Sequence, residues 1–237
     1  MSRVEPKLSV VPNLVRNGWR LIDDVLRGRV ENWRAANKRF ALLRILLLIA
    51  TCGSLYGATM GSYAPSWGET RVLQMCYSAL KVPFLLLLTF LISLPSFYVA
   101  NSMIGLHADF GRALRALMTT QAALTIVLAG VAPFTMLMYA SGCSYDQALA
   151  FNAGMFGLAS VSVQILLRRL YRPLIQCDPR HRWMVFAWIV IYSFVGIQMG
   201  WVLRPFIGSL NQATTFFREG AWGNAYLVVL ELISRLF

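Results

Sequence analysis

The side chains that could carry acid–base or metal chemistry are few, and they occur in pairs. The chain has two histidines: His107 precedes Asp109 by two residues, and Asp178 precedes His181 by three. A protein metal site usually has three or four converging ligands, and neither pair has a third one nearby in the sequence. We therefore predict that both pairs contact solvent or lipid headgroups, and that the protein holds no metal and no other cofactor.

Motifs of the common catalytic classes are absent from the sequence. None of the patterns H-E-x-x-H, G-x-S-x-G, G-x-x-x-x-G-K-[ST] and C-x-x-C occurs. The 10 acidic residues are scattered along the chain, so no two carboxylates are placed by spacing for acid–base work. We predict that the protein is not an enzyme and has no catalytic residues.

The elements that must position these side chains are membrane-spanning helices. The chain is 57% hydrophobic and 14% charged, whereas soluble domains average about 25% charged residues. A helix needs about 20 apolar residues to cross a bilayer. Five runs meet this requirement: Ala41–Gly61, Ala79–Val99, Leu117–Ala140, Ala148–Leu167 and Trp183–Leu203. We expect no cleavable secretory signal before the first of them. The sequence therefore predicts an all-α, polytopic helical membrane protein with five transmembrane helices.

The spans divide the chain into three regions, 1–40, 41–203 and 204–237. The first is predicted to hold an amphipathic helix that starts near Pro12 with Asn13 as its cap. Its apolar stripe is Val15, Trp19, Ile22, Leu26, Val30 and Trp33. Two interpretations stay open: the stripe lies on the membrane surface, or it packs on the ends of the spans. The third region is predicted to hold an interfacial helix, with a sixth span as the alternative.

Basic residues predict the orientation of the protein. The segments 1–44, 100–116 and 168–182 hold seventeen of the 22 Lys and Arg residues, against four in the segments on the other side. Cytoplasmic segments carry this excess, so we expect a cytoplasmic N-terminus and an external C-terminal tail. The basic side also suits anionic lipid headgroups, and we predict no nucleic-acid partner. The candidate headgroup or partner contacts are Arg20, Arg27, Arg34, Arg168, Arg169, Arg172, Arg180 and Arg182.

Small residues at a spacing of four indicate where helices pack closely. Gly53, Gly57 and Gly61 form one such face in the first span, and Gly196 and Gly200 form another in the fifth. Lipid supplies no hydrophobic drive for helix association, so close contact through small residues replaces it. These faces pack within one chain or between copies in a homo-oligomer, and the sequence leaves both open.

The four cysteines divide between the two sides and the membrane. Cys76 and Cys143 both fall on the external side, where an oxidising compartment would join them in a disulfide. Two packed thiols are the alternative.

Several segments resemble the bacterial members of the Yip-type five-span membrane protein superfamily and an uncharacterised bacterial integral membrane group. They are Lys-Val-Pro-Phe-Leu-Leu-Leu-Leu-Thr-Phe at 81–90, Gly-Trp-Val-Leu-Arg-Pro-Phe-Ile-Gly at 200–208 and the stretch from Phe216 to Tyr226. The resemblance implies a five-span protein of the bacterial inner membrane with a non-catalytic role. The Asp-Leu-Tyr-Gly-Pro motif of the eukaryotic members is replaced by Leu55-Tyr56-Gly57-Ala58, so no GTPase partner is implied.

Together these features predict a non-enzymatic membrane protein that acts by self-assembly or as a scaffold or accessory subunit of a larger complex. The alternative is an oligomeric passive channel lined by kinked helices. Pro83, Pro95 and Pro133 would supply the kinks, and neutral amide side chains would line the pore.

Overall fold

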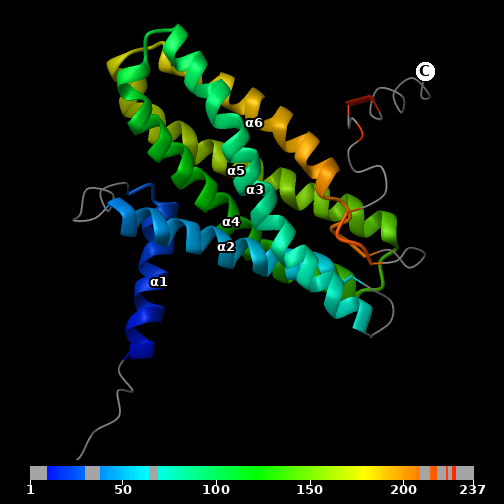
Figure 1. The fold of residues 1–237 in the computed structure, drawn as a ribbon. Coiled ribbons are helices and arrows are strands. Elements are labelled where there is room, and N and C mark those ends of the chain that lie inside the picture. The colour runs from blue at the N-terminus through cyan, green and yellow to red at the C-terminus, as the bar shows by residue number, and fades with distance from the viewer. Residues whose placement is uncertain are drawn as a thin grey trace, which may run out of the picture.

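The computed structural model of the protein describes residues 10–29, 38–63, 69–208, 214–217, 223 and 226–227. Its principal elements are six α-helices and one short 3-10 helix. They are α1 (Val10–Leu26), α2 (Lys38–Gly61), α3 (Glu69–Met103), η2 (His107–Asp109), α4 (Phe110–Ala140), α5 (Tyr145–Cys177) and α6 (His181–Leu203) (Figure 1). The five helices α2 to α6 are each long and apolar enough to cross a membrane. The predicted all-α polytopic class is confirmed, with five candidate spans in the described residues, while most of the tail that could form a sixth span lies outside them.

The helix ends differ from the predicted spans in the middle of the chain. The apolar segments of α2 and α6 match their predictions closely, whereas α3, α4 and α5 extend further at one or both ends, to Arg71–Met103, His107–Ala140 and Tyr145–Cys177. Apolar length sets only the part of a helix that crosses the hydrocarbon. Polar and basic residues continue the helical backbone hydrogen bonds beyond it, so these helices are longer than their apolar runs.

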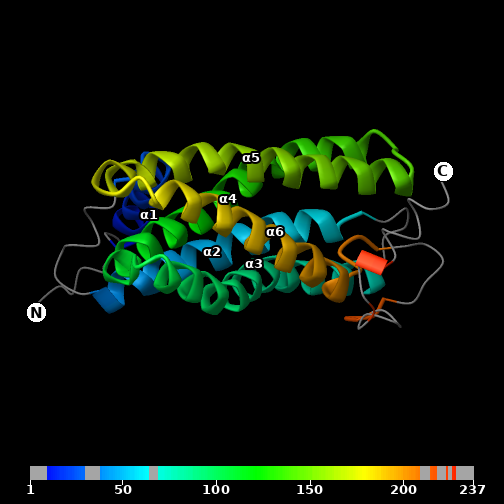
Figure 2. The same cartoon turned by 90° about the horizontal axis from the view of Figure 1, so that it is seen from above.

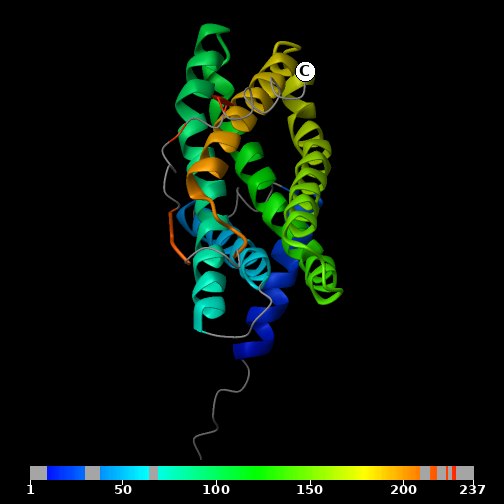
Figure 3. The same ribbon diagram turned by 90° about the vertical axis from the view of Figure 1, so that its right-hand side faces the viewer.

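The five long helices form an elongated bundle, and α1 lies at a steep angle to it (Figures 1 and 2). Helix α3 packs mainly against α2 and α6, and α4 packs mainly against α2 and α5. Helices α5 and α6 approach each other near the turn that joins them and then diverge (Figure 3). We call the end with the α3–α4 and α5–α6 turns the basic end, and the other end the distal end.

Glycine determines how closely α2 and α3 approach. A Cβ added at Gly57 would lie 2.2 Å from the Ser78 carbonyl oxygen, and one at Gly61 would lie 2.7 Å from the Gln74 carbonyl oxygen. At Gly53 the added atom would lie 3.1 Å from Pro83 Cβ. The glycine face of the first span therefore lies against α3 of the same chain, where two of its three positions have no room for a side chain.

The second glycine pair is placed differently. An added Cβ at Gly196 would lie 3.5 Å from Thr89 Cγ2, which is ordinary contact, and at Gly200 it would meet no atom within 4 Å. Gly200 therefore makes no close helix contact within the chain.

Helix α1 joins the bundle through its C-terminal end. Val25 is 4% exposed, and Gly28, at φ +66°, lies against Leu166 and Leu170 of α5. Trp19, from the predicted apolar stripe, is 68% exposed and free to meet a membrane surface.

The predicted start of this helix is wrong, because α1 begins at Val10 and contains both Pro12 and Asn13. Proline is tolerated in the first helical turn, where its missing N–H would have no helical partner. Val30, Trp33 and Arg34 lie outside the described residues, as does most of the predicted interfacial helix of the tail.

We expect Gly57→Ala to lower the free energy of unfolding by about 1–3 kcal/mol, the usual cost of inserting a methyl group where there is no space. The matched control is Gly130→Ala on α4, where an added Cβ meets nothing within 4 Å. That change should be neutral or slightly stabilising, because alanine favours helix. Thermal unfolding in mild detergent measures both, and equal midpoints for the two variants would contradict the close α2–α3 packing.

Candidate functional site

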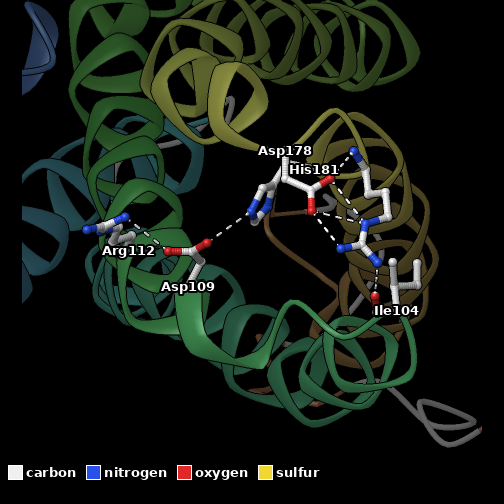
Figure 4. A network of polar contacts seen from close by, with 6 residues as sticks. Ile104, Asp109, Arg112, Asp178 and His181 are labelled. Carbon is white, nitrogen blue, oxygen red and sulfur yellow. Dashed lines mark hydrogen bonds and ion pairs between the residues drawn. The ribbon is translucent and has the colours of Figure 1, made fainter.

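Arg180 holds the α5–α6 turn against the α3–α4 turn through bonds to Asp178 and Ile104, which are labelled in Figure 4. Its Nη1 donates to the Ile104 carbonyl oxygen at 2.8 Å, and its Nε and Nη2 donate to the Asp178 carboxylate at 2.7–3.1 Å. Asp178 also accepts from the Arg180 backbone N–H at 2.9 Å, which closes the turn before α6. These bonds to Arg180 lower the pKa of Asp178 to about 2.

A second contact joins the same two turns (Figure 4). The Asp109 carboxylate lies 3.1 Å from Arg112 Nη1 and 3.5 Å from His181 Nε2. His181 is 0% exposed and lies edge-on to the ring of Tyr171. The structure thus places Asp109, from the first predicted His/Asp pair, next to His181, from the second. The prediction that the Asp178/His181 pair contacts solvent or lipid headgroups is wrong for His181, because its side chain is buried. Of the two histidines, His107 is the exposed one.

This network links helices rather than forming a metal site. No group of three or more His, Cys, Asp and Glu side chains comes together within the described part of the chain. The other basic residues predicted here, Arg168, Arg169, Arg172 and Arg182, are exposed around the network. Arg20 and Arg27 are exposed on and just after α1, and Arg27 pairs with Asp23 at 2.6 Å. Arg180 differs from these residues because its guanidinium reaches a separate turn, where it donates to the Ile104 carbonyl oxygen.

At the distal end, a polar row on α3 fixes the segment that follows α6. Lys81 Nζ donates to the Pro205 carbonyl oxygen at 2.7 Å and lies 4.9 Å from the centre of the Phe216 ring. One turn earlier, Ser78 Oγ donates to the Phe206 carbonyl oxygen at 2.5 Å. Lys81 is 0% exposed, although the sequence suggested only an external charge. The sequence signal for this burial was the position of Lys81, which lies just inside the apolar run Ala79–Val99.

A second functional candidate is a half-open cavity of about 630 Å³ that is lined mainly by α3, α4, α5 and α6 and also by Met60 and Phe206. Its lining includes residues of both α5 and α6, the two helices that diverge from their common turn. Helix α5 lines it with one face, including Asn152, Phe156 and Gln164, and α6 lines it with Trp188 and Tyr192. Its volume and largely apolar wall are typical of small-molecule sites in proteins.

Neutral polar groups interrupt the apolar wall at two places. The Gln121 amide donates to the Tyr192 hydroxyl at 2.7 Å and to the Leu86 carbonyl oxygen at 3.1 Å. Nearer the distal end, Asn152 accepts from Tyr56 at 3.2 Å and donates to Tyr139 at 2.6 Å. Gln121 thus joins α4 to α3 and α6, and Asn152 joins α5 to α2 and α4.

Two polar atoms at the cavity have no hydrogen-bond partner. They are Thr89 Oγ1, on a residue 1% exposed, and Gln164 Oε1. An unpaired buried polar group costs about 1–3 kcal/mol, so a molecule that pairs with these atoms recovers that energy.

The cysteines predicted as a candidate disulfide, Cys76 and Cys143, are free thiols in the structure. Cys76 is exposed on α3, which packs mainly on α2 and α6, whereas Cys143 lies half-buried in the α4–α5 turn. Cys52 and Cys177 are free as well.

We expect the α5–α6 turn to loosen only at strongly acidic pH. A carboxyl whose pKa is depressed on folding stabilises the protein above its unfolded pKa of about 3.9, and this stability is lost as the pH falls through the folded value. For Asp178 the folded value is about 2. Unfolding midpoints between pH 2 and pH 6 should therefore depend less on pH in Asp178→Asn than in the wild type. Asp146→Asn, at the distal end, is the control, and the same loss in both variants would contradict a role of the turn.

Comparison of the chain with protein-family models returned no match, and neither did comparison with curated proteins or with solved structures. The resemblance to the Yip-type superfamily stays a prediction, because none of these comparisons bears on it. Function is therefore inferred from the contacts of this chain.

Proposed function

We propose that the protein is a non-enzymatic membrane subunit that works by assembly, and that its first partner is a second copy of itself. The observation that carries this proposal is a row of small, exposed residues along α5: Ala150, Gly154 and Gly157. They are spaced by four and three residues, so they lie on one side of the helix. A Cβ added at either glycine would meet no atom within 4 Å.

The row differs from the exposed surface around it in side-chain size. Large apolar side chains are exposed on α6, among them Phe186, Val190 and Phe194, and also elsewhere on α5, at Leu149, Leu158, Val161 and Ile165. Large apolar side chains suit lipid tails, whereas small ones let a second helix approach closely. Gly57 and Gly61 show within this chain what such a row does when a helix meets it.

Helices α5 and α6 are both less buried inside the chain than α3 and α4. In the most apolar 18-residue windows, 39% of the residues of α3 and of α4 are buried, against 17% in α5 and 11% in α6, so the proposal rests on the size of the exposed side chains and not on burial. Helix α5 packs on α4 along one side and lines the cavity with another, so the row of small residues is left for a partner.

Cross-linking tests the α5 contact directly. In a chain whose four native cysteines are replaced by serine, Gly157→Cys should form a disulfide-linked dimer in membranes under mild oxidation. The matched control is Val190→Cys on α6, which is exposed but lies on the face with large side chains, and it should cross-link far less. Equal cross-linking of the two, or none in either, would exclude an α5-mediated dimer.

Native mass spectrometry in mild detergent measures the strength of the contact. Gly157→Leu should raise the dimer dissociation constant about tenfold or more, because the side chain separates the helices. Gly130→Leu places the same side chain at an open position on α4 and should leave the dimer unchanged. A monomer that carries another protein, lost in Gly157→Leu, would reassign the protein as an accessory subunit of a larger complex.

The proposal also includes an orientation, with the basic end in the cytoplasm of a bacterial inner membrane and anionic headgroups around its arginines. The support is the excess of basic residues in the segments at this end. An impermeant maleimide should label Cys177 in inside-out vesicles only, in a chain without the other cysteines. Ser141→Cys in the α4–α5 turn of a cysteine-free chain should give the opposite result, and the reverse pattern would invert the orientation.

A further inference from the structure

We propose that the cavity between α3, α4, α5 and α6 binds one neutral, single-chain lipid that carries a hydroxyl group, of the long-chain alcohol class. The proposal is independent of the α5 contact, because Ala150, Gly154 and Gly157 are not among the residues that line the cavity. It rests on three observations. The polar groups near the middle of the cavity lie at a similar depth in the bundle, two polar atoms at the cavity are unpaired, and no charged residue lines the cavity.

The polar groups near the middle of the cavity form one layer. Thr89, Gln121, Gln164 and Tyr192 lie between 11 and 14 residues from the basic-end limits of their helices, which are Met103, Phe110, Cys177 and His181. At 1.5 Å per residue this places all four about 17–21 Å into the bundle. A polar head bound here would reach deep into the hydrocarbon region, with its tail toward the distal end.

The unpaired atoms specify the hydrogen bonding of that head. Gln164 Oε1 can only accept a hydrogen bond, whereas the Thr89 hydroxyl can donate and accept. An alcohol can pair with either atom, because its O–H can donate to the glutamine oxygen and its oxygen can accept from the threonine hydroxyl. An ester or ketone carbonyl has no donor for Gln164.

The cavity lining excludes a charged head. No Lys, Arg, His, Asp or Glu is among the lining residues, so a carboxylate or phosphate would be buried without a counter-ion. The apolar remainder, which includes Phe156, Ile197 and Phe206, matches a hydrocarbon tail rather than a column of water. A cavity of about 630 Å³ has the size of a small-molecule site, which suits one chain better than the two chains of a phospholipid.

Photolabelling of the full chain in detergent tests the ligand class. The probes are a diazirine-bearing C18 alcohol, the C18 fatty acid with the same diazirine, and a phosphatidylcholine with the diazirine in one chain. The alcohol should label wild-type protein at least tenfold more than the other two, on peptides of α5 and α6, and unlabelled octadecanol should compete. Equal labelling by the fatty acid or the phosphatidylcholine would overturn the assignment of a neutral alcohol.

Two variants locate the site. Gly200→Phe puts a ring into the open space at the distal part of the cavity and should abolish labelling, whereas Gly130→Phe adds the same ring on the outer surface of α4 and should not. If both variants label like the wild type, the lipid binds elsewhere and the proposal fails.

Removing the unpaired polar atoms separates binding from folding. Thr89→Val and Gln164→Leu should each raise the octadecanol concentration needed for half-maximal competition about fivefold to tenfold. Each should also raise the unfolding midpoint of the ligand-free protein, because a buried polar atom without a partner is removed. Unchanged competition in both variants would overturn the proposed role of these atoms, and a variant that fails to fold would contradict their being unpaired.

Discussion

The backbone contact between α2 and α3 is the constraint on which the rest of the bundle depends. Gly57 and Gly61 bring two helices together closely enough to leave no room for a methyl group. In lipid, where burial of apolar surface gives no drive for association, such contact is a main source of helix attraction. With α2 and α3 joined, α4 packs on α2 and α6 packs on α3. Helix α5 reaches the bundle mainly through α4, which separates it from α6 and opens the cavity.

The class of fold could be predicted because bilayer thickness sets span length almost regardless of side-chain identity. The glycine spacing likewise indicated which face of the first span packs closely. The partner of that face could not be inferred, because a row of small residues carries no information about which helix will meet it. Gly57 met α3 of its own chain, whereas an equivalent row on α5 met none.

The contacts between turns were beyond the sequence for a different reason. Asp109 and His181 belong to separate turns, and only the packing of α3 against α6 brings those turns together. The same holds for Lys81, whose partner Pro205 follows the last span. Local patterns report on helical periodicity and length, but such pairings depend on helix order in the bundle. Gln121 and Tyr192 could be recognised as hydrogen-bonding groups, although not as one pair beside a cavity.

The position of α1 in the bundle has a consequence for the order in which the helices pack during synthesis. Gly28 lies against Leu166 and Leu170, which the ribosome adds only after four of the five spans have been started. While α2 and α3 are being made, α1 therefore has no docking site, because it packs on α4 and the Gly28 turn after it packs on α5. Exposed Trp19 is available to the membrane surface during that time. The docking site of α1 is complete only after α4 and α5 have been made, so α1 takes its final position later than the helices that follow it directly.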